Sequence, residues 1–294
     1  MAYIGRFAPT PSGPLHMGSL TAALASFLDA RHNQGQWLVR IEDIDPPRVQ
    51  TGATASILHC LERHQLFWDG NIRYQSRQLH DYHQIIDQWL VDQEAYLCSC
   101  SRQQLKDFAI YPGFCRDNPP DNSQPSAVRL VTRDREIAFT DLIQNQQCLN
   151  LATDIGDFVV RRKDGLIAYQ LAVAYDDADQ KITRVIRGAD LLDSSFKQLY
   201  ILSLLRKEAP RYGHIPLILS PSGDKLSKQE SAHALNQNTP EANLLQALDL
   251  LGQNPPNAIL QCTTKDILQW AIRHWSLETV PKIPSIVQNT HKSL

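Results

Sequence analysis

Residues 3–19 read YIGRFAPTPSGPLHMGS and join a strand pattern to a helix pattern through a turn-rich segment. Tyr3–Ala8 is typical of a strand, and Leu20–Arg31 is apolar at helical spacing. Trp37–Ile41 then indicates a second, buried strand. This β-α-β order predicts a parallel sheet, and the strand-to-helix turn lies at the carboxyl edge where such sheets bind ligands. A helix that begins near Ser19 offers free backbone N–H groups to phosphate.

The alternation of strands and helices continues along the chain with one interruption. Between Cys98 and Gln147 the chain is rich in Pro, Asn and Asp, with a short strand signal at Val128–Val131, which indicates an insertion. The C-terminal part is predicted to be helical, with Thr239 and Thr263 as N-caps and Gly252 after the first helix. The other expected elements are helices at 51–64, 79–93 and 195–205, and strands at 158–161, 168–174, 183–186 and 214–219.

Composition is that of an ordinary globular protein. The chain has 294 residues, of which 43% are hydrophobic and 20% charged, and its net charge is -2. No global positive field indicates a nucleic-acid partner, although a local basic face would suffice for RNA. The first residues do not resemble a signal peptide, and no stretch approaches the ~20 apolar residues of a membrane span. We therefore expect a cytoplasmic monomer with no membrane contact.

A second segment, Lys225-Leu226-Ser227-Lys228-Gln229, presents two lysines from a loop. Two ammonium groups three residues apart can cover the oxygens of a triphosphate, and His16 can donate a hydrogen bond to a phosphate oxygen. Each motif alone is also compatible with a plain structural role, because lysines in loops usually face solvent.

Taken together, the motifs resemble the class I aminoacyl-tRNA synthetases in their glutamyl and glutaminyl form. The resemblance is carried by residues 6–19, 157–173, 185–190 and 225–229, and it spans roughly residues 3–230 in order. It implies a Rossmann-like parallel-sheet catalytic domain in two halves, 1–94 and 153–220. An insertion at 95–152 holds a zinc-type site, and residues 221–294 form a signature loop and a small helical region that contacts an RNA stem.

The resemblance also implies the chemistry and its residues. ATP with Mg²⁺ and L-glutamate would be the substrates, and glutamyl-adenylate the intermediate. The catalytic residues would be His16, Lys225 and Lys228, and the ATP-binding residues His16, Gly18, Ser19 and Lys228. Ser19 and Gln229 replace residues that are commoner at these positions, which puts their individual roles in doubt.

Glutamate needs a complement for each of its charged groups. Arginine suits carboxylates because its planar fork pairs with two oxygens, and the resemblance places both Arg6 and Arg187 in the amino-acid pocket. Glu42 suits the α-ammonium group, and Tyr169 would line the pocket. The full set expected to bind glutamate is Arg6, Phe7, Ala8, Pro9, Thr10, Glu42, Tyr169 and Arg187.

Six cysteines divide into one cluster and three separate residues. Cys98, Cys100 and Cys115 are close in sequence and indicate either zinc or three unliganded thiols, since structural zinc takes four ligands and no fourth Cys or His lies between them. The resemblance supplies Tyr111 as the fourth ligand. Cys60, Cys148 and Cys262 are expected to be ordinary buried thiols.

Only 65 residues follow Gln229, which leaves room for a small stem-contact region but not for the usual anticodon-binding domains. Family members that lack those domains activate glutamate without tRNA. They then esterify it to a hydroxyl on the cyclopentene ring of queuosine in the anticodon stem-loop of tRNA(Asp), and we expect the same here. Two alternatives stay open: a truncated glutamyl-tRNA synthetase that charges a tRNA 3′ end, and a non-catalytic paralogue that binds RNA or an amino acid.

Overall fold

The computed structural model describes residues 2–121, 123–224, 235–236 and 238–287. Its centre is a parallel sheet in which β1 (Ile4–Phe7) pairs with β2 (Gln36–Ile41), and β2 pairs with β3 (Arg73–Tyr74). β9 (Arg184–Gly188) and β10 (Arg211–Ile215) form a second parallel pair. The pairs adjoin, because the Thr183 N–H donates to the Ile4 carbonyl at 2.9 Å. The predicted parallel sheet is therefore confirmed.

Helices cover this sheet. The connection from β1 to β2 is α1 (Met17–His32), which is buried on nearly all sides because it packs against both the sheet and two C-terminal helices. The other helices of this part of the chain are α2 (Ala53–Arg63), α3 (Leu79–Val91), α5 (Tyr169–Asp179) and α6 (Leu192–Leu204). The prediction of a strand at 168–174 is wrong, because these residues begin α5. A short apolar run is compatible with a buried helix as well as a strand, and burial here continues to the adjacent pair Asp176 and Asp177.

The strands of the insertion are antiparallel, and one of them pairs with a strand that follows the insertion in the chain. β4 (Ala95–Cys98), β5 (Ala127–Leu130) and β8 (Val159–Arg161) form one sheet, in which the strand predicted near Val128 is confirmed. α4 (Phe114–Asp117) lies beside β4. The hairpin of β6 (Glu136–Asp141) and β7 (Asn145–Asn150) was not predicted; its apolar residues are confined to the middle of β6 and to Cys148 and Leu149 of β7.

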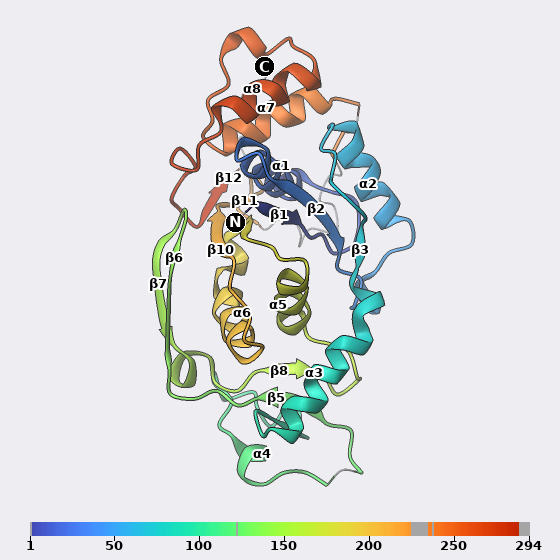
Figure 1. The fold of residues 1–294 in the computed structure, drawn as a ribbon, viewed down its shortest axis with the longest axis vertical. Helices are drawn as coiled ribbons and strands as arrows, with labels where there is room; N and C mark the ends of the chain where they lie inside the picture. Colours follow the sequence, from blue (N-terminus) through green and yellow to red (C-terminus); the bar gives the residue numbers. More distant parts are fainter. Residues whose placement is uncertain (1, 122, 225–234, 237, 288–294) are drawn as a thin grey trace.

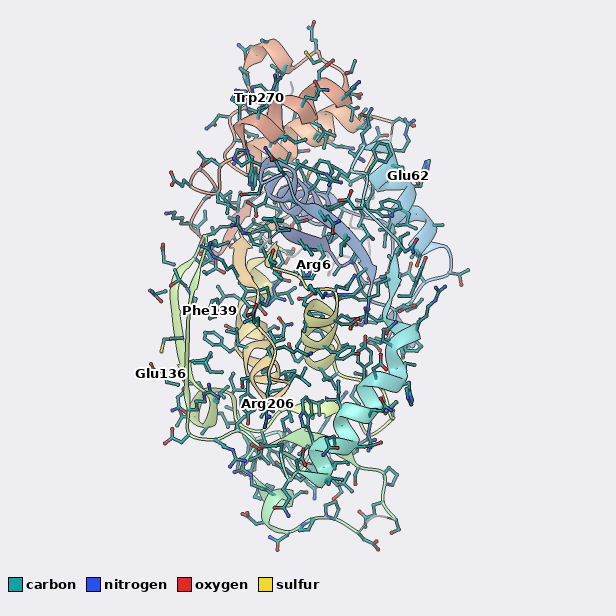
Figure 2. All side chains as sticks on the ribbon, in the orientation of Figure 1. Arg6, Glu62, Glu136, Phe139, Arg206 and Trp270 are labelled. Atoms are coloured by element: carbon teal, nitrogen blue, oxygen red, sulfur yellow. The ribbon has the colours of Figure 1, made fainter. Side chains whose placement is uncertain are left out.

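Figure 2 places Phe139 of this hairpin between β6 and α6, and its ring packs against Phe196 with centroids 5.2 Å apart. Leu142, in the turn of the hairpin, donates its N–H to the Tyr212 carbonyl at 2.8 Å. The hairpin therefore connects the insertion to β10 of the central sheet.

Two helices form the end of the molecule opposite α4: α7 (Pro240–Leu250) and α8 (Thr264–His274) (Figure 1). Thr263 caps α8 as predicted, with its hydroxyl accepting from the Asp266 N–H at 3.3 Å. Thr239 precedes α7 but does not cap it with its side chain, because its hydroxyl donates to the Asn236 carbonyl instead. Gly252 follows α7 with φ +69°, and a Cβ there would lie 2.3 Å from the Thr279 carbonyl oxygen.

The strand predicted at 214–219 is divided. β10 ends at Ile215, and after Pro216 the chain continues as β11 (Leu217–Leu219). Proline lacks an N–H and breaks the ladder with β9. β11 then pairs in parallel with β12 (Ser285–Val287), a C-terminal strand that the helical prediction for this region missed.

The buried side chains form two main cores. One joins the β1–β3 sheet to α1, α7 and α8, and the other joins α3, α5 and α6 to β4, β5 and β8. Cys60 is buried as predicted, whereas Cys148 is exposed and Cys262 partly exposed, so that prediction is wrong for both. Cys148 lies on β7 of the hairpin, where it does not enter a core. Among the described residues, no helix combines the length and apolar character needed to cross a membrane.

Candidate active site

A cavity of about 300 Å³ opens at the carboxyl ends of β1, β2 and β9. This is the edge at which parallel α/β sheets place ligands. Figure 2 shows Arg6 beside this edge, near the centre of the molecule. Every predicted glutamate-binding residue lines the cavity, and so do His16, Gly18 and Ser19: Arg6, Phe7, Ala8, Pro9, Thr10, His16, Gly18, Ser19, Glu42, Tyr169 and Arg187.

The two signature lysines, Lys225 and Lys228, lie outside the described residues, as does Gln229. The chain on either side of them is placed at the cavity. Leu217 and Ile218 of β11 line it, and the Leu235 N–H donates to the Leu15 carbonyl at 3.2 Å. Among the described residues on either side of this segment, Ile218 and Leu235 therefore lie beside residues 15–18.

His16 and Ser19 form a reciprocal cap at the start of α1. The Ser19 N–H donates to His16 Nδ1 at 3.3 Å, and the Ser19 hydroxyl accepts from the His16 N–H at 2.9 Å. Because Nδ1 accepts, the neutral ring carries its proton on Nε2, which stays available as a donor. Burial lowers the pKa of His16, against the opposing effect of Asp190, and favours this neutral ring.

Arg6 and Arg40 share one buried carboxylate behind the cavity. Arg6 approaches Asp177 with Nε and Nη2, each 3.2 Å from one of its oxygens. Arg40 Nη1 donates to Asp177 at 2.8 Å and to Gln180 at 2.9 Å. Burial would raise the pKa of Asp177, but the two guanidinium groups outweigh it and lower that pKa to about 2. Asp177 therefore stays ionised and fixes the orientation of Arg6.

Glu42 lies at the end of β2, and its N–H donates to the Pro9 carbonyl at 3.0 Å. Its carboxylate is 3.5 Å from Arg40 Nη2, a longer contact than the one Arg40 makes with Asp177. Burial raises the pKa of Glu42 to about 7, because Arg40 and Arg6 offset only part of the desolvation. A bound cation would restore the ionised form.

Arg187, in β9, has a fixed side chain. Its Nε donates to His214 Nε2 at 3.0 Å, and its Nη2 donates to the Ser195 hydroxyl at 2.8 Å. The remaining nitrogen, Nη1, is buried and has no hydrogen-bond partner among the described residues. A buried cation with an unpaired donor in a cavity wall suits an anionic ligand group.

The three clustered cysteines come together at one point of the insertion. The sulfur atoms of Cys98, Cys100 and Cys115 all lie within 4.8 Å of one another. The Tyr111 hydroxyl is 3.5 Å from Cys98 Sγ and 3.6 Å from Cys100 Sγ. Three soft thiol ligands and one oxygen around a common point fit the four-coordinate geometry of structural zinc.

The chain matches a known family over most of its length. The family described as tRNA synthetases class I (E and Q), catalytic domain, covers residues 4–109 and 116–279. The chain belongs to this class I synthetase family. As a member of the family, it is a ligase of the aminoacyl-tRNA synthetase type.

Relatives within the class I synthetases extend along the whole chain. Glutamyl-Q tRNA(Asp) synthetase of Pseudomonas paraeruginosa is 49% identical over 282 residues, 96% of each chain. The protein of the same name from Thiobacillus denitrificans is 46% identical over 294 residues, 98% of each chain. The crystal structure of a glutamate tRNA ligase from Elizabethkingia meningosepticum, in complex with its amino acid, matches with a TM-score of 0.82 and 25% identity, covering 99% of this chain and 68% of that one.

Several residues that shape the site of this class I synthetase were not predicted. Arg40 and Asp177 stand behind Arg6, and Asp141 and His214 stand behind Arg187. For the first two, the signal was present: a charged residue within the apolar run of β2, and a carboxylate pair at the end of the apolar run of α5. Asp141 belongs to the hairpin that the sequence did not reveal.

Proposed function

We propose that the chain activates L-glutamate with ATP, without needing tRNA, and transfers it to queuosine in the anticodon of tRNA(Asp). The relatives named glutamyl-Q tRNA(Asp) synthetase support this proposal, because each match covers nearly the full length of both this chain and the relative. The observation that carries it is the cavity itself, where Arg6, Glu42 and Arg187 line the same space as His16 at the start of α1. The proposed location is the cytoplasm.

Two arginines and one glutamate complement the charges of a glutamate substrate. In the proposal, Arg187 pairs its free Nη1 with one carboxylate, Arg6 supports the second, and Glu42 holds the α-ammonium group. Glutamine would offer a neutral amide where a carboxylate is expected. Leaving a buried charged donor without its full partner costs about 1–3 kcal/mol or more, so glutamate should be preferred.

In the first proposed step, an α-carboxylate oxygen of glutamate attacks the α-phosphorus of ATP. A P–O bond forms, the bond to the β-phosphate oxygen breaks, and pyrophosphate leaves with its Mg²⁺. The chain supplies cations and N–H groups rather than a covalent nucleophile. His16 Nε2–H, the N-terminus of α1, Lys225 and Lys228 are the proposed donors to the phosphates.

In the second proposed step, a hydroxyl oxygen on the cyclopentene ring of queuosine attacks the activated carbonyl carbon. The new ester bond forms as the bond between the carbonyl carbon and the AMP phosphate oxygen breaks, AMP leaves, and the hydroxyl proton passes to water. Far from this cavity, a zinc ion held by Cys98, Cys100, Tyr111 and Cys115 would cross-link the loops of the insertion and stabilise them.

Pyrophosphate exchange tests the first step. We expect exchange with glutamate in the absence of tRNA, and little with glutamine or aspartate. Absence of glutamate-dependent exchange would contradict the proposal and favour a non-catalytic paralogue. Acceptance by queuosine-containing tRNA(Asp) with a phosphate-blocked 3′ end tests the second step, and loss of acceptance on blocking would favour ordinary 3′-end charging.

Lys228→Ala should separate activation from substrate binding. A positioned cation that acts on the transition state contributes roughly 100- to 1,000-fold in rate, so we expect a loss of that size in exchange. Glutamate affinity, measured by calorimetry, should change little, because Arg6, Glu42 and Arg187 are intact. The surface variant Lys265→Ala, on α8, is the matched control and should behave as the wild type. Equal losses in exchange and in glutamate affinity would contradict the role given to Lys228.

A further inference from the structure

His214 is a fully buried histidine with a single possible pattern of hydrogen bonds. A guanidinium group can only donate, so His214 Nε2 must accept the hydrogen bond from Arg187 Nε at 3.0 Å. The imidazole is then neutral and carries its proton on Nδ1, which donates to Asp141 Oδ2 at 2.6 Å. The Ser195 hydroxyl accepts from Arg187 and lies 3.3 Å from His214 Nε2, to which it can donate. Every contact agrees with this one tautomer.

Asp141, at the end of β6, is fixed by the backbone around it. Its Oδ1 accepts N–H groups from Ile143 at 3.0 Å, Gln144 at 2.8 Å and His214 at 3.1 Å. Three donors on one oxygen fix the orientation of the carboxylate and leave Oδ2 for the imidazole. The β6–β7 hairpin is thereby connected to Arg187 in the cavity wall through the buried side chains of Asp141 and His214.

Burial favours the neutral form of the His214 ring. Burial is the largest influence that lowers its pKa, and Arg187 and Arg6 act in the same direction, while Asp141 opposes them. The remaining neighbours are the Ser195 hydroxyl from α6 and the ring of Tyr212, stacked 6.1 Å away on the same strand. A protonated ring would place an N–H against the Nε–H of Arg187.

We propose that Asp141 and His214 are positioning residues that set the preference for glutamate. They hold Arg187 through its Nε, so that Nη1 remains the unpaired donor in the cavity wall. This inference rests on the proposed function, because it takes the anionic ligand of Arg187 to be a carboxylate of glutamate. The insertion then contributes to amino-acid selection through Asp141, at the end of β6.

Asp141→Asn tests the pair with almost no change in volume. The three backbone donors require the amide oxygen to keep the place of Oδ1, so the amide NH₂ group must face His214 Nδ1. His214 then becomes an acceptor at Nδ1 and carries its proton on Nε2, opposite the Arg187 Nε–H. We expect the KM for glutamate to rise about 10- to 100-fold, as for the loss of a hydrogen bond to a charged group. The KM for ATP and the kcat should stay near their wild-type values.

Controls separate positioning from general damage. Glu136→Gln, at the exposed start of the same strand, should leave the KM for glutamate unchanged. The preference for glutamate over glutamine should fall in Asp141→Asn by the same factor as the KM rises. If Asp141→Asn does not fold, Ser195→Ala removes the hydroxyl that lies beside both Arg187 Nη2 and His214 Nε2, while Nη2 still donates to the Leu191 carbonyl, and it should raise the KM for glutamate severalfold. A KM within twofold of wild type in the folded variant would overturn the inference.

A spectroscopic measurement tests the tautomer without relying on activity. The side-chain ¹⁵N shifts of His214, assigned with His214→Gln, should show a neutral ring protonated on Nδ1 in the wild type and on Nε2 in Asp141→Asn. A wild-type ring protonated on Nε2 would overturn the inference. Wild-type protein that fails to activate glutamate would instead overturn the proposed function, and the ¹⁵N shifts would still report the pairing of Asp141 with His214.

Discussion

Glu42 is a buried carboxyl group whose pKa is raised to about 7 by desolvation, in spite of Arg40 and Arg6. Only its ionised form can pair with the ammonium group of glutamate. As pH falls below about 7 the free enzyme takes up a proton at Glu42, and roughly a tenth of the molecules stay ionised one unit lower. We therefore expect the KM for glutamate to rise about five- to tenfold between pH 8 and pH 6, measured by pyrophosphate exchange.

Glu42→Gln is the matched variant for this pH dependence. It should have a high KM for glutamate at pH 8 and little further change down to pH 6, because no carboxylate remains to titrate. The KM for ATP should be insensitive to pH over this range in both proteins. A pH profile that keeps its wild-type slope in Glu42→Gln would assign the titration to another group.

At the scale of residues, the side chains that line the cavity were predicted from the sequence, whereas the buried residues that hydrogen-bond to them were not. Arg6, Glu42, Tyr169 and Arg187 are far apart in the chain, yet all line one space. Their supports could not be predicted, because each depends on tertiary contacts: Asp177 lies 171 residues from Arg6, and Asp141 lies 73 residues from His214. Periodicity identifies buried positions, but it does not say which buried polar groups meet.

The Ser19 side chain stabilises the start of α1. The Ser19 hydroxyl accepts from the His16 N–H and donates to the His16 carbonyl, both at 2.9 Å. Ser19→Ala removes both bonds, and the loss of a helix cap typically costs about 1 kcal/mol. We expect a decrease of that size in the free energy of unfolding by urea, and slower exchange with an unchanged KM for glutamate, because the backbone of His16 loses both of its bonds to the Ser19 hydroxyl.

Ser19→Thr keeps the hydroxyl and should recover both properties. Recovery of stability without recovery of exchange would contradict the link between the cap and His16. Thr21, whose hydroxyl donates to the Met17 carbonyl within the same helix, supplies a control outside the cap. Thr21→Ser retains that bond and should leave exchange unchanged.

At the scale of elements, the long helical patterns and several short strands were predicted, whereas one short apolar run and the β6–β7 hairpin were not. The helices α1, α2, α3 and α6 have long periodic patterns and were placed within a few residues. Residues 168–174 form a short, mostly apolar run in which 171–174 are buried, and for such a run strand and helix patterns are the same. In the β6–β7 hairpin the apolar stretch of β6 is only three residues long and β7 is mostly polar, so the strand pair was not predicted.

At the scale of the whole molecule, a buried ionic network joins the two cores. Arg6 and Arg40 come from the sheet that packs on α1, while Asp176 and Asp177 come from α5 in the second core. Arg40 is fully buried and lies 3.7 Å from Asp176 and 2.8 Å from Asp177. The cavity is lined by Phe7 and Ile186 of the first core and by Tyr169 of α5, so its geometry depends on how α5 is held against the sheet.

Arg40→Met should reduce the stability of the protein more than the removal of a surface ion pair does, because Arg40 belongs to the buried ionic network between the two cores. Removing one partner of a buried pair leaves an uncompensated charge and typically costs about 3–5 kcal/mol. We expect a decrease of that size in the free energy of unfolding by urea at pH 7, together with a higher KM for glutamate as Asp177 loses a partner beside Arg6. Arg133→Met removes an exposed contact with Glu94 and should cost about 1 kcal/mol or less.

Acid adds a second test of the same network. The pKa of Asp177 lies near 2 in the folded protein, below its ordinary value of 3.8, so its stabilising effect is complete above pH 3.8 and is lost as pH falls toward 2. Arg40→Met should raise this folded-state pKa and make the acid loss smaller. If the two proteins lost stability equally between pH 4 and pH 2, Asp177 would owe its low pKa to Arg6 alone, and Arg40 would not be needed to join the cores.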